Sequence, residues 1–385
     1  MQVRVLTSNA AGGGQGETLP LPTGGYATPH GVPTFYGAVR LGEDISPQLL
    51  AELPRSAAWA HLVHVTALWS PSSLAALSYA LLPHPARIGA SLRAAWPLPP
   101  YRPVVLSPRG ALLPWAMAQR AERKAMALRV LRPLLRRVAG WHATSQAEAE
   151  AIVRLRLVGP GAALSVVGNG VNLPVLAAVP DAPTGDLLGR IDALPAPHIL
   201  ALGRIHPVKN LELAVAALVR LRRLPGCEQA TLLLAGPERA GHPYGDMLRA
   251  QAAAAGVGEG VQFLGLVSGP SKDALLARAD LLWLPSHMES FGNVVIEALA
   301  AGTPVLAATS TPWQELEAQR VGRCLPAEPE AFAQATAQLL RLYPRESWRE
   351  RCRAVAAERY SWGGVQAQLR RLYDTVLARH AALLG

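Results

Sequence analysis

Two glutamates, Glu289 and Glu297, lie eight residues apart in the segment 285–304. The apolar residues 281–284 predict a buried strand, and residues 293–301 predict a helix. The loop between them places Glu289 at the carboxyl edge of a parallel sheet, where such folds bind ligands. Glu297, one turn into the helix, can accept hydrogen bonds from two ribose hydroxyls, and Glu289 can accept them from a sugar. The two glutamates, together with the sequence between them, predict a site for sugar hydroxyls.

The start of this predicted helix favours an anion. Gly292 allows close backbone approach, and Asn293 is suited to cap the helix. Free N–H groups at the helix start, together with the helix dipole, suit a phosphate, and Gly302-Thr-Pro304 ends the helix. An ordinary strand–loop–helix with two surface glutamates is the plainer interpretation, but the Ser-Phe-Gly-Asn sequence between the glutamates favours the ligand site.

Strands and helices that alternate along the chain must position this site. Such alternation predicts right-handed βαβ units and a parallel sheet with helices on both faces. In the second half we expect strands at 198–203, 231–235, 261–264, 281–284 and 305–307, and helices at 211–224, 244–255, 272–279, 293–301 and 362–384. In the first half we expect strands at 3–7, 62–66, 104–107 and 140–144, and helices at 72–81, 115–138 and 146–155.

Three features of the sequence depart from this alternation of strands and helices. Residues 174–197 contain five prolines and no sustained period, which predicts an interdomain connection. Pro133 predicts a kink or break in the long helix 115–138. No amphipathic helix follows the first strand, because residues 9–34 are rich in Gly, Pro and Thr, so the chain either opens irregularly or lacks a first strand and helix.

The chain of 385 residues is long enough for two domains and contains no uncharged apolar run of membrane-spanning length. No secretory signal is recognisable at its start. Three cysteines, Cys227, Cys324 and Cys352, fit neither a metal site nor a disulfide framework, so we expect a cytoplasmic protein without a bound metal.

The positive charge is concentrated in the first half. The formal net charge is +10, and residues 1–173 alone carry 16 basic and 7 acidic side chains. Much of the excess lies in one basic stretch, Arg120–Arg137. Such a stretch attracts an anionic membrane surface, a phosphate or a nucleic acid, although a solvated helix explains it equally well. Leu128, Leu131 and Leu135 would add apolar contact with a membrane if they are exposed.

The segment ESFGNVVIEALAAGTPV (289–305) resembles the signature of the retaining GT-B glycosyltransferases of family 4, or group 1. The segments GRIHPVKNLELAVAAL (203–218), LLLAGPE, FLGLVS and ADLLWLPS follow in that family's order. In the first half, HLVHVTALWSP, VVLSPRGALLPWA, WHATSQAEAEAI and VVGNGVN are similar to bacterial polysaccharide-forming members.

The resemblance implies an α/β protein of GT-B fold, with two Rossmann-like domains facing each other across a cleft. We expect an acceptor-binding domain at 1–173, a linker at 174–197 and a nucleotide-sugar-binding domain at 198–360. The C-terminal helix, 361–385, is expected to cross back to the first domain.

The resemblance also assigns roles to the donor side. Arg204, Lys209 and Glu289 are the implied catalytic residues, because two cations at the diphosphate stabilise the charge that develops on the leaving group. The implied nucleotide-sugar-binding residues are Gly203, Phe291, Gly292, Asn293, Val294 and Glu297. No cofactor or metal is implied, because the nucleotide sugar is a substrate. Retention of configuration is thought to arise by attack on the same face within an ion pair, with the departing phosphate taking the acceptor's proton.

Four residues are candidates for binding the acceptor: His64, Trp69, Arg109 and His142. They lie at or near the ends of three predicted strands of the first half, and a structural role is as plausible for each. The chain departs from the family here, because Thr66 stands where many relatives have a second His. The family's Gly-Gly loop has no clear counterpart, and 12–14 is the nearest candidate.

The function implied is sugar transfer from a nucleotide sugar to a saccharide or lipid-linked acceptor, in bacterial surface polysaccharide or lipopolysaccharide synthesis, with peripheral attachment to the inner face of the membrane. The alternatives are a nucleotide-sugar epimerase of the same fold and an inactive scaffold. The three lysines leave none for the pyridoxal phosphate of a phosphorylase, since Lys209 already lies in the diphosphate motif. The absence of a helix-turn-helix signal and of zinc ligands argues against a nucleic-acid partner.

Overall fold

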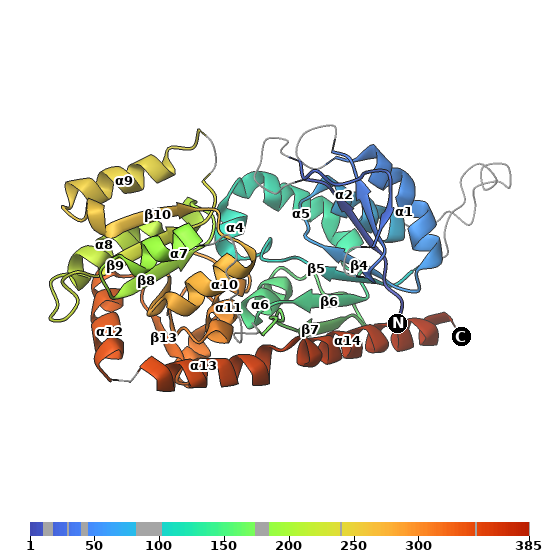
Figure 1. The fold of residues 1–385 in the computed structure, drawn as a ribbon. Coiled ribbons are helices and arrows are strands. Elements are labelled where there is room, and N and C mark those ends of the chain that lie inside the picture. Colours follow the sequence, from blue (N-terminus) through green and yellow to red (C-terminus); the bar gives the residue numbers. More distant parts are fainter. Residues whose placement is uncertain are drawn as a thin grey trace. The chain divides into compact units, whose positions relative to one another are not determined.

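The computed structural model (Figure 1) describes residues 1–10, 18–28, 31–39, 45–81, 102–173, 185–238, 241–342 and 345–384. The chain forms two compact units. The first contains residues 1–167 and 368–385, and the second contains residues 168–367. Each unit has its own core, and each is described by itself.

The second unit is built on a six-stranded parallel sheet with the strand order β10-β9-β8-β11-β12-β13. Its strands are β8 (His198–Leu202), β9 (Thr231–Ala235), β10 (Val261–Gly265), β11 (Leu281–Leu284), β12 (Val305–Ala308) and β13 (Gly322–Leu325). Strands such as β9 and β11 are buried along their whole length, which explains their uninterrupted apolar sequences.

Helices of the second unit pack in two groups. One group joins α9 (Tyr244–Ala254), α8 (Leu211–Leu221) and α12 (Pro329–Leu342), and the other joins α7 (Gly185–Asp192), α10 (Gly269–Arg278), α11 (Asn293–Ala301) and α13 (Arg345–Tyr360). The ribbon shows these helices around the sheet (Figure 1). Parallel strands need such cover on both faces, because side chains from both faces must be removed from water.

The first unit contains two sheets. The strands β4 (Val63–Thr66), β5 (Val104–Ser107), β6 (Gly140–Ala143) and β7 (Ala163–Val166) form a parallel sheet in that order. The strands β1 (Val5–Ser8), β3 (Thr34–Gly37) and β2 (Gly25–Ala27) form a second sheet, in which β2 is antiparallel to β3. The helices are α1 (Pro47–Trp59), α2 (Pro71–Leu81), α4 (Pro114–Ala118), α5 (Ala121–Leu135) and α6 (Gln146–Arg154).

The C-terminal helix α14 (Trp362–Leu384) belongs to the first unit from Gln368 onward. There its residues Leu372 and Val376 are buried against Val105 and Ala163 of the four-stranded sheet. Arg379 also donates a hydrogen bond to the carbonyl of Gly161 at 2.8 Å. The apolar spacing of this helix therefore reflects burial rather than a free surface.

The α/β class, with parallel sheets in two Rossmann-like units, agrees with the prediction. Several details differ. The helix α7 forms inside the segment 174–197, where no helix is predicted, and it buries Leu188 and Ile191. The elements β13, α12 and α13 lie between residues 308 and 361, for which the sequence predicts no element.

The predicted break at Pro133 is wrong. The helix α5 continues through Pro133 to Leu135, and the long predicted helix is interrupted instead at Gln119 and Arg120. Arg120 adopts a left-handed conformation with φ 58°, which a continuous α-helix does not allow. The chain opens irregularly, with the antiparallel strand β2 in the region without a helix pattern, and residues 12–14 lie outside the described residues.

Candidate functional site

The site begins with two loops of the second unit that are fastened together at the carboxyl edge of its sheet. The turn Pro207–Lys209 follows β8, and the loop from Pro285 follows β11. The buried side chain of Asn210 donates from Nδ2 to the carbonyl of Pro285 at 3.1 Å. The N–H of His287 donates to the carbonyl of Val208 at 2.9 Å. These two bonds fix the loops that carry the predicted lysine and glutamate.

Lys209 and Glu289 form an ion pair within this arrangement. The Nζ atom of Lys209 lies 2.6 Å from Oε1 of Glu289, and the two side chains are 18% and 11% exposed. The hydroxyl of Ser286 donates to the same oxygen at 2.7 Å. A Cβ atom on Gly203 would lie 3.1 Å from Cε of Lys209, so glycine leaves room for the lysine. The structure thus brings three predicted site residues together.

Helix α11 begins beside this pair, and it begins without a side-chain cap. The N-cap residue is Gly292, with φ 85°, and it has no side chain that could accept a hydrogen bond from the first turn. The prediction that Asn293 caps the helix is wrong, because Asn293 is the first helical residue and its Oδ1 accepts from Nδ2 of Asn169 at 2.6 Å. Without a capping side chain, the first-turn N–H groups and the helix dipole suit a phosphate.

Trp313 supports the loop before this helix, although no sequence motif singles it out. Its Nε1 donates to the carbonyl of Phe291 at 2.6 Å, and a Cβ atom on Gly292 would lie 3.1 Å from Nε1. The rings of Phe291, Trp313 and Tyr360 form a buried cluster with centroid distances of 5.2, 5.7 and 6.3 Å. Phe291 and Val294 are each 7% exposed, so both predicted residues are largely buried.

Glu297 lies in the same helix and has its own lysine partner. The Nζ atom of Lys272, on α10, lies 2.9 Å from Oε1 of Glu297, and the side chains are 25% and 26% exposed. Each glutamate of the pattern is therefore held by a lysine through one carboxylate oxygen. Arg204, the remaining predicted cation, is exposed at the end of β8.

The predicted acceptor residues His64, Arg109 and His142 lie together in the first unit. The imidazole rings of His64 and His142 are 5.5 Å apart, and the Nδ1 atom of His64 lies 2.7 Å from the hydroxyl of Tyr373 on α14. Burial, with smaller contributions from His142 and Arg109, lowers the pKa of His64 to about 3. Burial is also the main cause of a lowered pKa at His142, whose Nε2 lies 2.9 Å from the carbonyl of Val167. Both rings are therefore neutral near pH 7.

Glu148 is a buried acid that the sequence did not single out. Its carboxylate accepts from the N–H of Gly110, and from the N–H and hydroxyl of Thr144 at 2.7 and 2.9 Å. These bonds fasten the loop that carries Arg109, whose backbone is left-handed with φ 55°. The sequence does contain a signal that could have pointed to Glu148. Ser145 and Glu148 have the spacing of a capping box, and Ser145, the N-cap of α6, accepts a hydrogen bond from the N–H of Glu148.

Trp69 and Thr66 lie at the same end of the first unit's sheet. The Nε1 atom of Trp69 donates to the carbonyl of Ala111 at 3.0 Å, so the indole already has a hydrogen-bond partner within the fold. The ammonium of Lys124 lies 5.9 Å from the centre of a Trp69 ring. Thr66 is exposed at the last position of β4.

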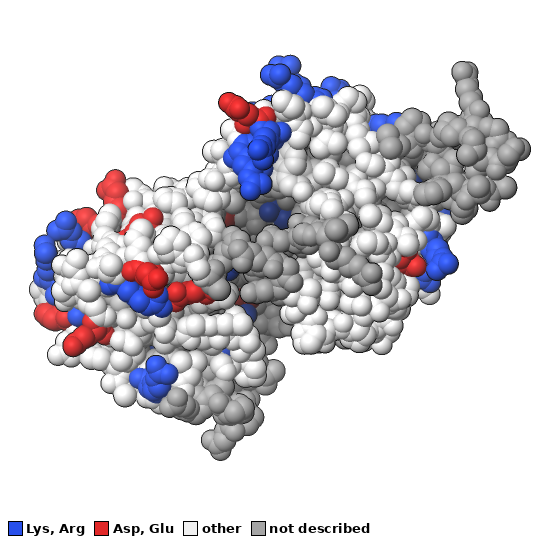
Figure 2. Space-filling model, turned by 90° about the horizontal axis from the view of Figure 1, so that it is seen from above, with Lys and Arg blue, Asp and Glu red and all other residues white. Residues whose placement is uncertain are grey.

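The basic stretch lies on α5 and on the turn before it. Leu128 and Leu135 are buried, and Leu131 packs against the same core, so the exposure that membrane contact by these leucines would require is not met. The large apolar side chains of α5 that are exposed are Met126 and Val130, 68% and 74% exposed. Figure 2 shows the basic side chains of one face in separate groups, with acidic side chains beside several of them.

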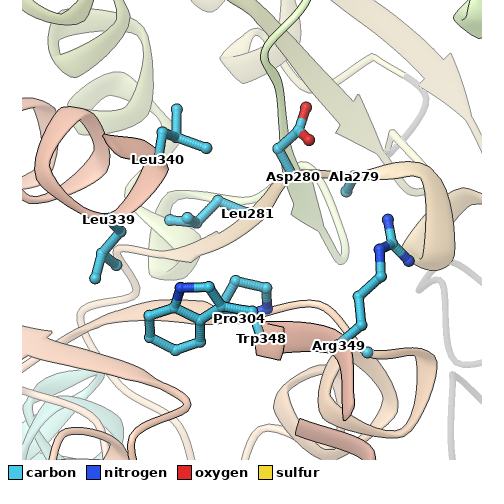
Figure 3. A pocket seen from close by; sticks show the side chains of 9 residues that line it. Ala279, Asp280, Leu281, Pro304, Leu339, Leu340, Trp348 and Arg349 are labelled. Carbon is cyan, nitrogen blue, oxygen red and sulfur yellow. The ribbon is translucent and has the colours of Figure 1, made fainter. Parts of the chain in front are cut away.

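A cavity of about 160 Å³ lies elsewhere in the second unit. Leu281, Gly302 and Pro304 line it at the amino ends of β11 and β12, opposite the edge that carries Glu289. Figure 3 shows Leu339 and Leu340 on one side of it and Arg349 on the other. Because it faces away from both glutamates, this cavity is not part of the candidate site.

No group of three His, Cys, Asp or Glu side chains among the described residues is arranged to hold a metal ion. Likewise, none of the described helices is long and apolar enough to cross a membrane.

Comparison with known sequences identifies the class of protein that the second unit resembles. Residues 193–359 match the family model described as glycosyl transferases group 1. A phosphatidyl-myo-inositol mannosyltransferase of Mycobacterium leprae is 33% identical over 258 residues, which cover 64% of this chain and 62% of the relative. A D-inositol 3-phosphate glycosyltransferase of Nocardia farcinica is 42% identical over 113 residues, or 29% of this chain and 25% of the relative. The chain thus spans less than two thirds of the length of these relatives.

Comparison with solved structures covers more of the chain. Anabaena HepE, solved in complex with UDP and glucose, has a TM-score of 0.67 at 22% identity, over 90% of this chain and 87% of that one. The sucrose-phosphate synthase of Thermosynechococcus elongatus also has a TM-score of 0.67, at 21% identity, over 98% of this chain and 89% of that one. The fold is therefore that of the GT-B glycosyltransferases, as predicted.

Proposed function

We propose that this protein is a glycosyltransferase that moves a sugar from a nucleotide sugar to a saccharide or lipid-linked saccharide, with retention of configuration at the anomeric carbon. The observation that carries the proposal is the pair of lysine-held glutamates beside the uncapped start of α11. The match of residues 193–359 to glycosyl transferases group 1 supports it.

The geometry supports a division of roles at the donor. The N–H groups at the start of α11 receive the diphosphate, and Arg204 and Lys209 add positive charge to it. Lys209 has three N–H donors and uses one on Glu289, so the others are free to reach a phosphate while the ion pair aims the ammonium. Glu289 accepts from hydroxyls of the transferred sugar, and Glu297 accepts from the ribose.

The proposed reaction uses these residues as follows. The acceptor hydroxyl forms the new bond to the anomeric carbon on the face from which the diphosphate departs. The bond to the diphosphate oxygen breaks, and the electron pair leaves with the nucleoside diphosphate. That phosphate takes the acceptor's proton, while Arg204 and Lys209 stabilise its negative charge. The dipole of α11 also stabilises the negative charge on the departing diphosphate.

The acceptor and the location are finer parts of the proposal. A lipid-linked acceptor of bacterial surface polysaccharide suits a cytoplasmic protein held at an anionic membrane surface. The Mycobacterium leprae relative is described as acting on phosphatidyl-myo-inositol, which supports a lipid acceptor. The exposed arginines of α5, with Met126 and Val130 among them, offer both charge and apolar contact for such a surface.

Product analysis tests the proposal against its alternatives. The protein is incubated with UDP-, GDP- and ADP-sugars, with and without a mixture of saccharide and lipid-linked acceptors, and products are followed by NMR and mass spectrometry. The proposal expects a glycoside with the donor's anomeric configuration, formed only with an acceptor. A free, altered sugar without any acceptor would identify an epimerase, and folded protein that converts no donor would indicate an inactive scaffold.

A further inference from the structure

Lys272 lies on a different helix from the glutamate that it holds. It belongs to α10, which packs against α11. Its ammonium lies 2.9 Å from Oε1 of Glu297, and both side chains are about three quarters buried. The sequence contains only two other lysines. One is Lys209, which holds Glu289 in the same manner, and the other is Lys124 of the first unit, which donates to the carbonyl of Ala116 at 2.5 Å.

The ion pair with Lys272 occupies only one of the two carboxylate oxygens of Glu297. Lys272 is the only partner that Glu297 has among the described residues, and it uses Oε1. An ionised carboxylate has about four lone-pair positions on its two oxygens, so Oε2 is available for hydroxyl donors. A glutamate side chain that is free to rotate loses conformational entropy when it is fixed. Lys272 fixes it before a ligand arrives.

A second carboxylate lies close to this pair. Burial raises the pKa of Asp273, and the charge of Glu297 adds to this effect while Lys272 opposes it. Without Lys272, the repulsion between the charges of Glu297 and Asp273 would lose the cation that opposes it, which favours other positions of the Glu297 side chain.

We propose that Lys272 is a positioning residue for the ribose of the donor. By holding Oε1 of Glu297, it directs Oε2 toward the ribose hydroxyls and so gives the site its preference for a ribonucleotide. This inference rests on the proposed function, because it requires a nucleoside diphosphate at the start of α11.

Titration calorimetry with matched nucleotides tests the inference. Of UDP, GDP and ADP, the one with the lowest dissociation constant is compared with its own 2′,3′-dideoxy form, which lacks both hydroxyls. For the wild type, we expect the ribonucleotide to bind at least about tenfold tighter. In Lys272→Met, this preference should fall to about threefold or less, because the variant should bind the ribonucleotide more weakly and the dideoxy form as tightly as the wild type does.

Two control variants separate positioning from loss of structure. Lys124→Met removes a lysine of the first unit and should leave the preference unchanged. Lys272→Arg keeps the cation and should retain most of the preference, which a role in folding alone would not require. In Glu297→Gln, the further change Lys272→Met should have no added effect on the preference, because the lysine acts through the carboxylate.

The outcomes are distinguishable. If the wild type prefers the ribonucleotide and Lys272→Met retains that preference in full, the inference is wrong while the proposed function stands. A wild type that binds both nucleotide forms equally well also overturns it. If the folded wild type binds none of the three diphosphates, the proposed function itself fails. Circular dichroism of each variant establishes that the fold is retained.

Discussion

The ammonium of Lys209 lies 2.6 Å from the carboxylate of Glu289, and the two residues come from different loops of one sheet edge. The pair joins a cation suited to a diphosphate with an acceptor suited to sugar hydroxyls. A change in one residue should therefore disturb the other, although the two act on different parts of the donor.

The first prediction concerns Glu289. The change Glu289→Ala removes the acceptor for the sugar hydroxyls and frees Lys209, which still carries its charge. Turnover should fall by about tenfold to a hundredfold, while the affinity for the free nucleoside diphosphate changes by less than about threefold. Steady-state kinetics and calorimetry measure the two effects. A loss of nucleotide affinity as large as the loss of turnover would contradict the role assigned to Glu289.

The second prediction concerns Trp313. The change Trp313→Phe keeps an aromatic ring against Phe291 and Tyr360 but removes the donor to the carbonyl of Phe291. The loop before α11 should loosen, so nucleotide affinity should fall by about threefold to tenfold. The free energy of unfolding should fall by about 1–3 kcal/mol, the cost of an unsatisfied buried group.

Trp283→Phe is the matched control for this change. The Nε1 atom of Trp283 donates to the hydroxyl of Thr336 at 3.0 Å within the same core, but not to the loop of the site. This variant should lose comparable stability and keep its nucleotide affinity. Equal losses of affinity in both variants would mean that Trp313 affects the site only through general stability.

The third prediction concerns pH. His64 and His142 have lowered pKa values, about 3 for His64, so the folded protein holds both rings neutral where the unfolded chain, with an ordinary pKa near 6.5, is protonated. The unfolded state then binds more protons, so the free energy of unfolding should fall as pH drops below about 6.5. The slope is up to about 1.4 kcal/mol per pH unit for each group.

Urea denaturation at pH 7, 6 and 5 measures this slope. The variant His64→Phe should show a shallower slope, whatever its stability at pH 7, whereas the same change at the exposed His61 should leave it unaltered. If the His64→Phe slope matches that of the wild type, protonation of His64 does not limit stability in acid.

The fourth prediction concerns the basic helix α5. Vesicles with anionic lipid should bind the protein, and neutral vesicles or high salt should abolish binding. Changing Arg129, Arg132 and Arg136 to Gln should weaken binding on the order of a hundredfold, at about 1 kcal/mol for each charge. Met126→Ser with Val130→Ser should weaken it further. Sedimentation measures all of these.

A matched triple variant shows whether position matters. Arg154, Arg220 and Arg223 are exposed elsewhere on the molecule, and their change to Gln removes the same charge. Binding should then persist. Equal loss in both triple variants would indicate attraction by net charge alone, and binding that survives the α5 changes would leave no role for that helix.

The sequence predicts the strands β8 to β12 and the helices between them, because these strands are apolar runs and their turns are marked by glycine and proline, but it does not predict α7, β13, α12 or α13. The strand–loop–helix that carries Glu289 and Glu297 is an example. Asn293 was assigned wrongly as a cap because both asparagine and glycine favour that position, and only the backbone shows that Gly292 occupies it.

Contacts between residues that are far apart in the chain cannot be predicted from this sequence. Trp313 lies 22 residues from the carbonyl that it binds, and Tyr373 lies 309 residues from His64. No periodicity or local motif connects such positions. The sequence also leaves open which face of α5 is exposed, because leucines and arginines at similar spacing do not show which of them meets the core until the neighbouring helix is placed.

The measurement that tests the account most directly is calorimetric titration of UDP, GDP and ADP into the wild type and into Lys209→Ala and Glu297→Ala. At least one diphosphate should bind the wild type. Each variant should bind it about tenfold to a hundredfold more weakly, as expected when a charged hydrogen-bonding group is lost. If no diphosphate binds the folded wild type, or if both variants stay within twofold of it, the sheet edge that carries Glu289 and Glu297 is not a nucleotide-sugar site.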